Sequence, residues 1–228
     1  MQNENYKIEI HHDAHADNPF KEWDGLPLIA VKFGNKLETG YQEDQILETI
    51  QEELTYEAFK ENKKRLMDLT EEYVGIEFTG YDLTEEEDLN EVYSEVHYAI
   101  TSIDDFDLIK EVLENLNIAH HLHYSRGYSQ GDYAEVIFLT EDKEKIKTLS
   151  KLFNDWAWGD TYGYVAYKKK PFIKTYEDGS TEEDYEWEEE DSCWGFYGDN
   201  PETNGMKENI PEEYKELLKE FDYTQIKY

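Results

Sequence analysis

The sequence predicts an α+β fold in which helices cover one face of a mostly antiparallel sheet. Two observations support this class. From residue 104 onward, the spacing of apolar residues and turn residues indicates the order α-β-β-α-β-β. In addition, apolar residues make up 38% and aromatic residues 15% of the 228 residues, which is enough for a buried core despite the high charge.

The N-terminal part is expected to hold two strands and one long helix. Residues 6–10 alternate between apolar and polar side chains and read as a strand, and residues 28–33 read as a second short strand. A polar loop separates them. Residues 42–73 carry apolar side chains at spacings of three and four, which is typical of a helix.

The later elements follow from the same rules. Residues 83–100 are ambiguous, although their apolar spacing fits a helix and Thr84 with Glu87 resembles a capping box. Either Ser102 or Asp104 is expected to cap the next helix. The remaining elements are expected at 104–117 (helix), 118–125 and 133–139 (strands joined around Gly127 and Gly131), 141–156 (helix), 161–176 and 181–187 (a hairpin turning at 178–180) and 211–221 (a helix started by Pro211).

The domain organisation is less marked than the elements. The chain has no low-complexity linker and no evident internal repeat. Residues 1–75 are interpreted as an N-terminal subdomain of strands plus a long helix, and residues 76–228 as an α+β domain. A single domain is the other interpretation, because 228 residues fit one large domain or two small ones.

Charge dominates the composition. There are 55 Asp and Glu against 22 Lys and Arg, which gives a net charge of −33. Direct binding to nucleic acid or to an anionic membrane is therefore not expected, because neutralising phosphates requires clustered Lys and Arg. The single cysteine, Cys193, forms no internal disulfide and fits a reducing cytosol, and no stretch reaches the ~18 apolar residues of a membrane span. These features predict a cytoplasmic location.

The carboxylates are clustered in three runs. Residues 177–191 hold ten acids and no base, and residues 82–107 hold ten more, again without a base. In a strand, acids at every second position of the first run would lie on one face ~6.6 Å apart. A third run, residues 42–57, includes acids one helical turn apart. Both spacings are close to the ~7 Å between phosphates along one DNA strand.

Such dense like charge destabilises a compact fold, so its presence calls for a reason. Adaptation to high salt is one reason, but the bases are 20 Lys and only two Arg beside many Tyr, Ile and Asn, a bias of AT-rich genomes. The remaining interpretation is that the charge is the function. The expected contact surface comprises Glu182, Glu183, Asp184, Glu186, Glu188, Glu189, Glu190 and Asp191, followed by Asp82, Glu85, Glu86, Glu87, Asp88 and Glu91.

Catalytic chemistry is poorly supported. His11, Asp13, His15 and Asp17 stand at alternate positions in a loop that also holds His12, and they would suit zinc or manganese if extended, but a polar loop is the favoured interpretation. His120, His121 and His123 read as half-buried strand histidines. Cys193 lies among acids, which raise a thiol pKa, and there is no nucleophile elbow near Ser125 or Ser129. No enzyme activity, metal or cofactor is predicted.

Three segments combine Gly with aromatic residues and an acid: 127–133, 159–164 and 191–198. Tight turns with aromatic packing are the favoured interpretation, over an aromatic recognition pocket. Together with Trp23-Asp24, the motifs Gly-Tyr-Ser-Gln-Gly-Asp at 127–132 and Asp-Ser-Cys-Trp-Gly-Phe-Tyr-Gly at 191–198 resemble a family of acidic proteins of phages and mobile elements whose function is unsettled. The resemblance implies a viral or mobile-element origin and implies no catalytic residues.

The charge pattern is similar to that of DNA-mimic anti-defence proteins. The expected function is a phage-encoded inhibitor that blocks the DNA-binding groove of a host defence nuclease, either a restriction enzyme or a CRISPR effector. One alternative is a metal-dependent counter-defence hydrolase using His11, Asp13 and His15. Another is an acidic adaptor that binds a basic host protein outside any DNA groove. Homodimerisation is left open by the sequence.

Overall fold

The computed structural model describes residues 1–34, 36–38, 43–102, 105–126, 133–140, 142–222, 224 and 226–227. It confirms the α+β class, with antiparallel sheets and helices in the predicted order. The strands form two separate sheets rather than one. The predicted features at Gln42, Asp104, Ser129, Glu141 and the 127–132 motif lie outside the described residues.

The chain divides into two compact units. The first combines Met1–Asn18 with Lys151–Tyr228, and the second is Pro19–Ser150. The first unit is discontinuous because strand β1 (Tyr6–His12) pairs with β6 (Thr161–Thr175). The boundary expected after residue 75 falls inside the second unit, since helices on either side of that point pack against each other.

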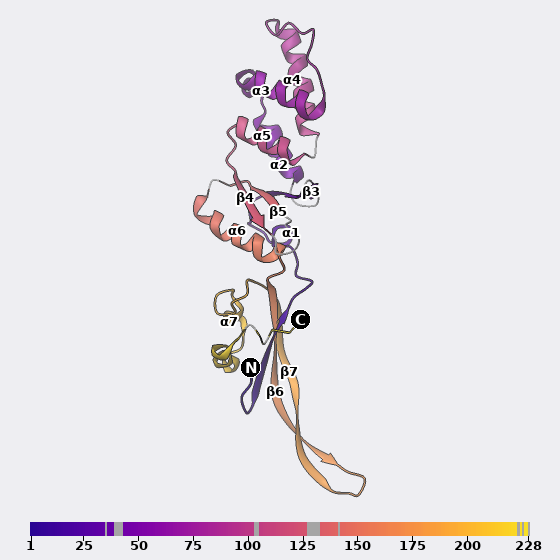
Figure 1. The fold of residues 1–228 in the computed structure, drawn as a ribbon, viewed down its shortest axis with the longest axis vertical. Helices are drawn as coiled ribbons and strands as arrows, with labels where there is room; N and C mark the ends of the chain where they lie inside the picture. Colours follow the sequence, from indigo (N-terminus) through magenta and orange to yellow (C-terminus); the bar gives the residue numbers. More distant parts are fainter. Residues whose placement is uncertain are drawn as a thin grey trace. The chain divides into compact units, whose positions relative to one another are not determined.

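The first unit is built on an antiparallel sheet of order β1-β6-β7, where β7 is Thr181–Tyr197. The pairing of β1 with β6 ends at Tyr6 and Lys168. The β6–β7 pairing continues to Thr175 and Thr181, so the distal hairpin is a two-stranded ribbon without a third strand (Figure 1). The ribbon is exposed to solvent on both faces around residues 170–183.

One face of this sheet carries the core of the first unit. Ile8, Ile10, Tyr164 and Phe196 pack against buried residues of the C-terminal segment. That segment holds α7 (Met206–Asn209), α8 (Glu212–Lys215) and the 3₁₀-helix η1 (Glu216–Glu220). The single helix expected at 211–221 is therefore an α-turn followed by 3₁₀ turns.

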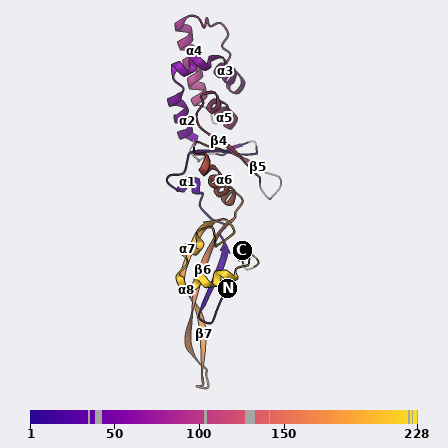
Figure 2. The same cartoon turned by 90° about the vertical axis from the view of Figure 1, so that its left-hand side faces the viewer.

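The second unit contains a four-stranded antiparallel sheet of order β3-β2-β5-β4 and a helical part. Its strands are β2 (Ile29–Phe33), β3 (Lys36–Glu38), β4 (His121–Arg126) and β5 (Tyr133–Phe138). Its helices are α1 (Pro19–Glu22), α2 (Glu43–Glu53), α3 (Tyr56–Val74), α4 (Glu86–Thr101), α5 (Phe106–Asn115) and the part of α6 (Lys143–Ala157) that ends at Ser150 (Figure 2). The apolar core joins the helices to strands β2 and β5.

The long helix expected at 42–73 is two helices, α2 and α3. Thr55 breaks it by taking an extended conformation, in which its hydroxyl oxygen accepts a hydrogen bond from the Ala58 backbone N–H at 3.2 Å. This is the N-cap geometry that Thr favours over a helix interior. The apolar spacing on both sides of Thr55 continues without interruption, which is why periodicity alone joined the two helices.

Two predicted caps are wrong. Thr84 does not cap α4, because its hydroxyl donates to Asp82 and Glu85 occupies the cap position without a side-chain bond. At α5 the cap is Asp105, whose carboxylate accepts from the backbone N–H groups of Asp107 and Leu108. Sequence rules place such boundaries only within one or two residues.

Candidate acidic interaction surfaces

The first candidate surface, the acids of β7, lies next to a row of lysines. In the β6–β7 register, Glu188 faces Lys168, Glu186 faces Lys170 and Glu182 faces Lys174. Directly opposite residues of an antiparallel pair share one face of the sheet. That face therefore alternates between acids on β7 and lysines on β6.

Ion pairs confirm this interleaving. Lys170 Nζ lies 2.9 Å from Glu188 Oε1, and Lys168 Nζ lies 3.3 Å from Glu190 Oε1. Exposed pairs of this kind add little stability, but they cancel charge locally. The row of anions expected at Asp184, Glu186, Glu188 and Glu190 is therefore interrupted by lysines, because the partner strand supplies the cations that the acidic run itself lacks.

Two of the predicted contact residues bind core tyrosines. Tyr164 donates to Asp191 at 2.7 Å, and Tyr214 donates to Glu190 at 2.8 Å. Both tyrosines are at most 1% exposed. Burial raises the pKa of each tyrosine, and the hydrogen bond to its carboxylate raises it further. Glu190 and Asp191 thus accept hydrogen bonds from buried hydroxyl groups, and they link β7 to α8 and to β6.

The second candidate surface lies where α3 ends and α4 begins. We use the name helical acidic surface for the carboxylates of Asp68, Glu71, Glu72, Glu77, Asp82, Glu85, Glu86, Glu87, Asp88, Glu91 and Glu95. All except Asp88 and Glu95 belong to exposed residues. The sequence contains no Lys or Arg between Arg65 and Lys110, so the chain brings no cation into this stretch.

Hydrogen bonds hold the connecting loop against α4. The Asp88 carboxylate accepts from the Asp82 backbone N–H at 2.6 Å, and Tyr81 donates to Glu95 at 3.2 Å. Thr84 donates to Asp82 through its hydroxyl and its backbone N–H, which lowers the pKa of Asp82. Within the described part of the chain, no carboxylate of the helical acidic surface forms an ion pair. The negative charge of this surface is therefore not neutralised by direct ion pairs among the described residues, although Arg65 lies near enough to Asp68 and Glu72, and Lys60 to Glu86, to interact with them electrostatically.

The third acidic run contributes a smaller surface. Glu48 and Glu52 are exposed on α2, as the helical spacing predicts. Glu57, at the start of α3, pairs with Lys60 at 2.6 Å. The side chains of Glu43 and Asp44 lie outside the described residues. This run does not add a continuous row of free acids.

Side chains of the N-terminal histidine segment make contacts that hold the fold together. His12 Nε2 lies 2.7 Å from the Gly159 carbonyl, and His11 Nε2 lies 3.4 Å from Glu9. The Asp13 carboxylate accepts from the backbone N–H groups of His15 and Gly195, each at 3.2 Å. The described residues contain no group of three or more His, Cys, Asp or Glu that could hold a metal ion.

The Gly-aromatic segments of the first unit pack against each other. A Cβ added to Gly163 would lie 2.3 Å from Trp194 Cε3, so the indole requires a glycine there. Gly195 has a φ of 82°, which favours glycine, and Tyr197 donates to the Asp17 carbonyl at 2.6 Å. These contacts support the structural interpretation of the segments at 159–164 and 191–198.

Comparison with protein-family models, with curated proteins and with solved structures finds no match for this chain. Among the described helices, none is long and apolar enough to cross a membrane. The case for function therefore depends on the surfaces of the molecule itself.

Proposed function

We propose that this chain is a DNA-mimic inhibitor, which presents carboxylates to the cationic, duplex-binding groove of another protein. The target class follows from the resemblance to phage and mobile-element proteins: a host defence nuclease, either a restriction enzyme or a CRISPR effector. The helical acidic surface is the principal contact. Its support is one observation, namely eleven carboxylates between residues 68 and 95 that lack ion-pair partners among the described residues.

The helical acidic surface suits this role better than the β6–β7 ribbon. A cationic groove binds phosphates through long-range attraction and through release of counterions. A surface that carries only negative charge reproduces both effects, whereas a face that alternates Lys and Glu attracts and repels the same groove. The ribbon acids that form no ion pair among the described residues, including Glu183, Asp184, Glu186 and Glu189, belong to a secondary contact in this proposal.

Acids in the first turn of α4 also stabilise that helix, by about 0.3–1 kcal/mol each, because they interact favourably with the positive end of the helix dipole. That local role accounts for Glu86, Glu87 and Asp88 but not for Asp68, Glu71 and Glu72, which lie in the C-terminal half of α3. Carboxylates near a helix C-terminus are unfavourable for the fold. Glu71 has a local role, because its carboxylate accepts from the Phe78 backbone N–H at 3.4 Å, so Glu72 and Asp68 are the acids of α3 that favour a role in binding.

The first experiment identifies the partner. The full chain is immobilised, exposed to host lysate at low salt, and eluted with competing duplex DNA. A DNA-binding protein that is released by duplex DNA supports mimicry. A partner that remains bound in the presence of excess DNA contradicts it and favours the acidic adaptor.

The second experiment tests the surface with two variants of equal charge. One carries Glu85→Gln, Glu86→Gln, Glu87→Gln and Glu91→Gln on the helical acidic surface. The other carries Glu183→Gln, Glu186→Gln, Glu188→Gln and Glu189→Gln on the ribbon, and each raises the net charge by four. We expect the first to weaken partner binding at least tenfold and to flatten its salt dependence, and the second to weaken it less than threefold. Equal losses would remove the assignment to the helical acidic surface.

A further inference from the structure

A cavity of about 550 Å³ lies in the second unit, beside the start of α6. It is lined by Ala119, His120, His121, Thr140, Lys143 and Ile146. The volume falls within the ~300–1,000 Å³ of typical small-molecule sites. Ala119 and Ile146 provide apolar walls, and the other four residues provide polar groups.

Three of the four polar side chains of this cavity, His121, Thr140 and Lys143, can donate a hydrogen bond into it, whereas His120 uses its N–H on the Ile118 carbonyl and its other ring nitrogen accepts. Lys143 carries an ammonium group, and the Thr140 hydroxyl oxygen accepts from the Asp142 N–H at 3.0 Å, which leaves its own proton to donate. His120 Nδ1 lies 2.8 Å from the Ile118 carbonyl, which can only accept, so that nitrogen carries the proton. Nε2 of His120 is left for another partner.

Two of these groups have no protein partner in the part of the chain that the structure describes. Neither the His121 ring nor Lys143 Nζ makes a hydrogen bond or an ion pair with a described residue. Burial and the neighbouring His123 and His120 lower the pKa of His121, since a second positive charge is unfavourable there without a counter-ion. Among the described lining residues, the ammonium group of Lys143 therefore has no anionic partner.

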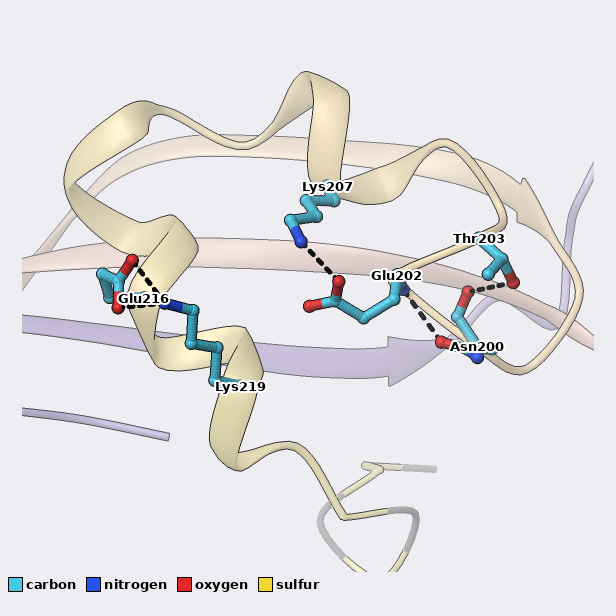
Figure 3. Close-up of polar contacts among 6 residues, drawn as sticks. All are labelled: Asn200, Glu202, Thr203, Lys207, Glu216 and Lys219. Atoms are coloured by element: carbon cyan, nitrogen blue, oxygen red, sulfur yellow. Dashed lines mark hydrogen bonds and ion pairs between the residues drawn. The ribbon is translucent and has the colours of Figure 1, made fainter.

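The lining is also unusual for this chain because no described lining residue is a carboxylate. A cavity of about 420 Å³ in the first unit provides the contrast, with Lys207 and Lys219 among its lining residues. There each lysine is neutralised by an acid: Lys207 pairs with Glu202, and Lys219 pairs with Glu216 at 2.6 Å (Figure 3). With 55 acids against 22 bases in the sequence, a cavity whose described lining holds a lysine and no carboxylate is the exception.

We propose that the cavity of His120, His121, Thr140 and Lys143 binds a small organic anion, in which a carboxylate, sulfonate or phosphate group is carried on an apolar body. The anionic group lies between Lys143, the His121 imidazole and the Thr140 hydroxyl, with the His120 ring beside it. The apolar body lies against Ala119 and Ile146. This site is separate from the helical acidic surface and does not depend on the proposed DNA mimicry.

The test uses 8-anilinonaphthalene-1-sulfonate as the probe, and N-phenyl-1-naphthylamine as a control that has the same rings without the sulfonate. Both are titrated into the full chain while probe fluorescence is recorded. We expect saturable binding of the sulfonate at one site and at least tenfold weaker binding of the neutral amine, because hydrogen bonds to charged groups supply the difference.

Two lysine variants distinguish binding inside the cavity from general attraction of the sulfonate to positive charge. Lys143→Gln should weaken sulfonate binding about tenfold, whereas Lys147→Gln, one helical turn further along α6 and outside the lining, should change it less than twofold. Far-ultraviolet circular dichroism checks that both variants are folded. A direct readout needs no variant: the imidazole proton resonances of His120 and His121 should shift on addition of the sulfonate, while those of His11 and His12 should not.

The proposal fails if the sulfonate does not saturate below about millimolar concentration, or if the neutral amine binds equally well. It fails as well if the two lysine variants respond alike, or if the His120 and His121 resonances remain unchanged while the probe is bound. In each of these cases the dye binds elsewhere or through its rings alone.

Discussion

Glu9, on strand β1, shows how a single carboxylate can be surrounded by cations in a strongly acidic chain. Its side chain is 11% exposed and pairs with Lys7 at 2.7 Å and with Lys227 of the C-terminal segment. Burial alone would raise the pKa of Glu9, but hydrogen bonds from Lys227 and Lys7 outweigh it and lower the pKa to about 2. The sequence did not reveal this site, because Lys227 is 218 positions away.

The first prediction concerns the pH dependence of this carboxylate. Since the folded pKa of about 2 lies below the ordinary value of 4.5, the ionised form stabilises the fold above pH ~4.5 and that contribution is lost as pH falls toward 2. Glu9→Gln should lower the unfolding free energy at pH 7 by on the order of 2–3 kcal/mol and by much less at pH 2. Urea denaturation at the two pH values measures this, and an equal loss at both would contradict it.

The second prediction separates a structural acid from a surface acid on the same strand. Asp191→Ala removes the carboxylate partner of the buried Tyr164 hydroxyl, which can still donate to the Asn209 carbonyl at 3.1 Å, and should cost about 1–1.5 kcal/mol of unfolding free energy. Asp184→Ala is the matched control, since Asp184 faces Phe172 on the exposed ribbon, and should cost less than about 0.5 kcal/mol. Chemical denaturation of both variants distinguishes them; equal costs would mean that Asp191 is not an anchor.

At the scale of elements, the β6–β7 ribbon shows which properties a local pattern can predict. Alternation of residues predicted both strands and their turn, and the structure confirms their presence, although β7 continues to Tyr197, ten residues beyond the predicted end at 187. The distal ribbon is two-stranded and exposed on both faces, because the pairing of β1 with β6 ends at Lys168. The local pattern did not predict this, since it carries no information on where a third strand ends. Isolated two-stranded ribbons are only marginally stable. The Lys–Glu ladder and the aromatic residues along it are therefore expected to contribute to the stability of the ribbon itself.

The third prediction concerns the break between α2 and α3. Thr55→Ala removes the oxygen that accepts from the Ala58 N–H and should lower the unfolding free energy by about 1 kcal/mol. Thr49→Ala serves as the control, because the Thr49 hydroxyl only donates to the Gln45 carbonyl of its own helix. We expect that control to be nearly neutral. Thermal or urea denaturation compares the two, and a neutral Thr55→Ala would show that the loop conformation caps α3 without the hydroxyl.

At the scale of the whole molecule, net charge opposes folding. A charge of −33 repels itself, and the helical acidic surface concentrates this repulsion because it has no ion pairs among the described residues. The Debye length, over which charges interact, falls from ~30 Å at 0.01 M to ~3 Å at 1 M salt, so salt screens this repulsion more strongly. Salt should therefore stabilise the protein, although it weakens exposed ion pairs.

The fourth prediction follows from that balance. The melting temperature should rise by several degrees between about 10 mM and 500 mM NaCl, since relieving about 1 kcal/mol of repulsion shifts it by a few degrees in a chain of this size. Sucrose at matched osmolality is the control for effects other than screening. The variant with four Gln on the helical acidic surface should show a smaller rise. A melting temperature that falls with salt would mean that ion pairs outweigh the repulsion.

The order of elements and the separation of acids into runs follow from the sequence, because periodicity and composition are local properties. Which acids are free does not. Lys168 and Lys170 neutralise Glu190 and Glu188 only through the hairpin register, and Asp191 is engaged only because Tyr164 is buried beside it. The histidines at 120 and 121 likewise meet Lys143 only across the cavity. Charge compensation acts between neighbours in space, so the tertiary structure alone decides which charges remain available to a partner.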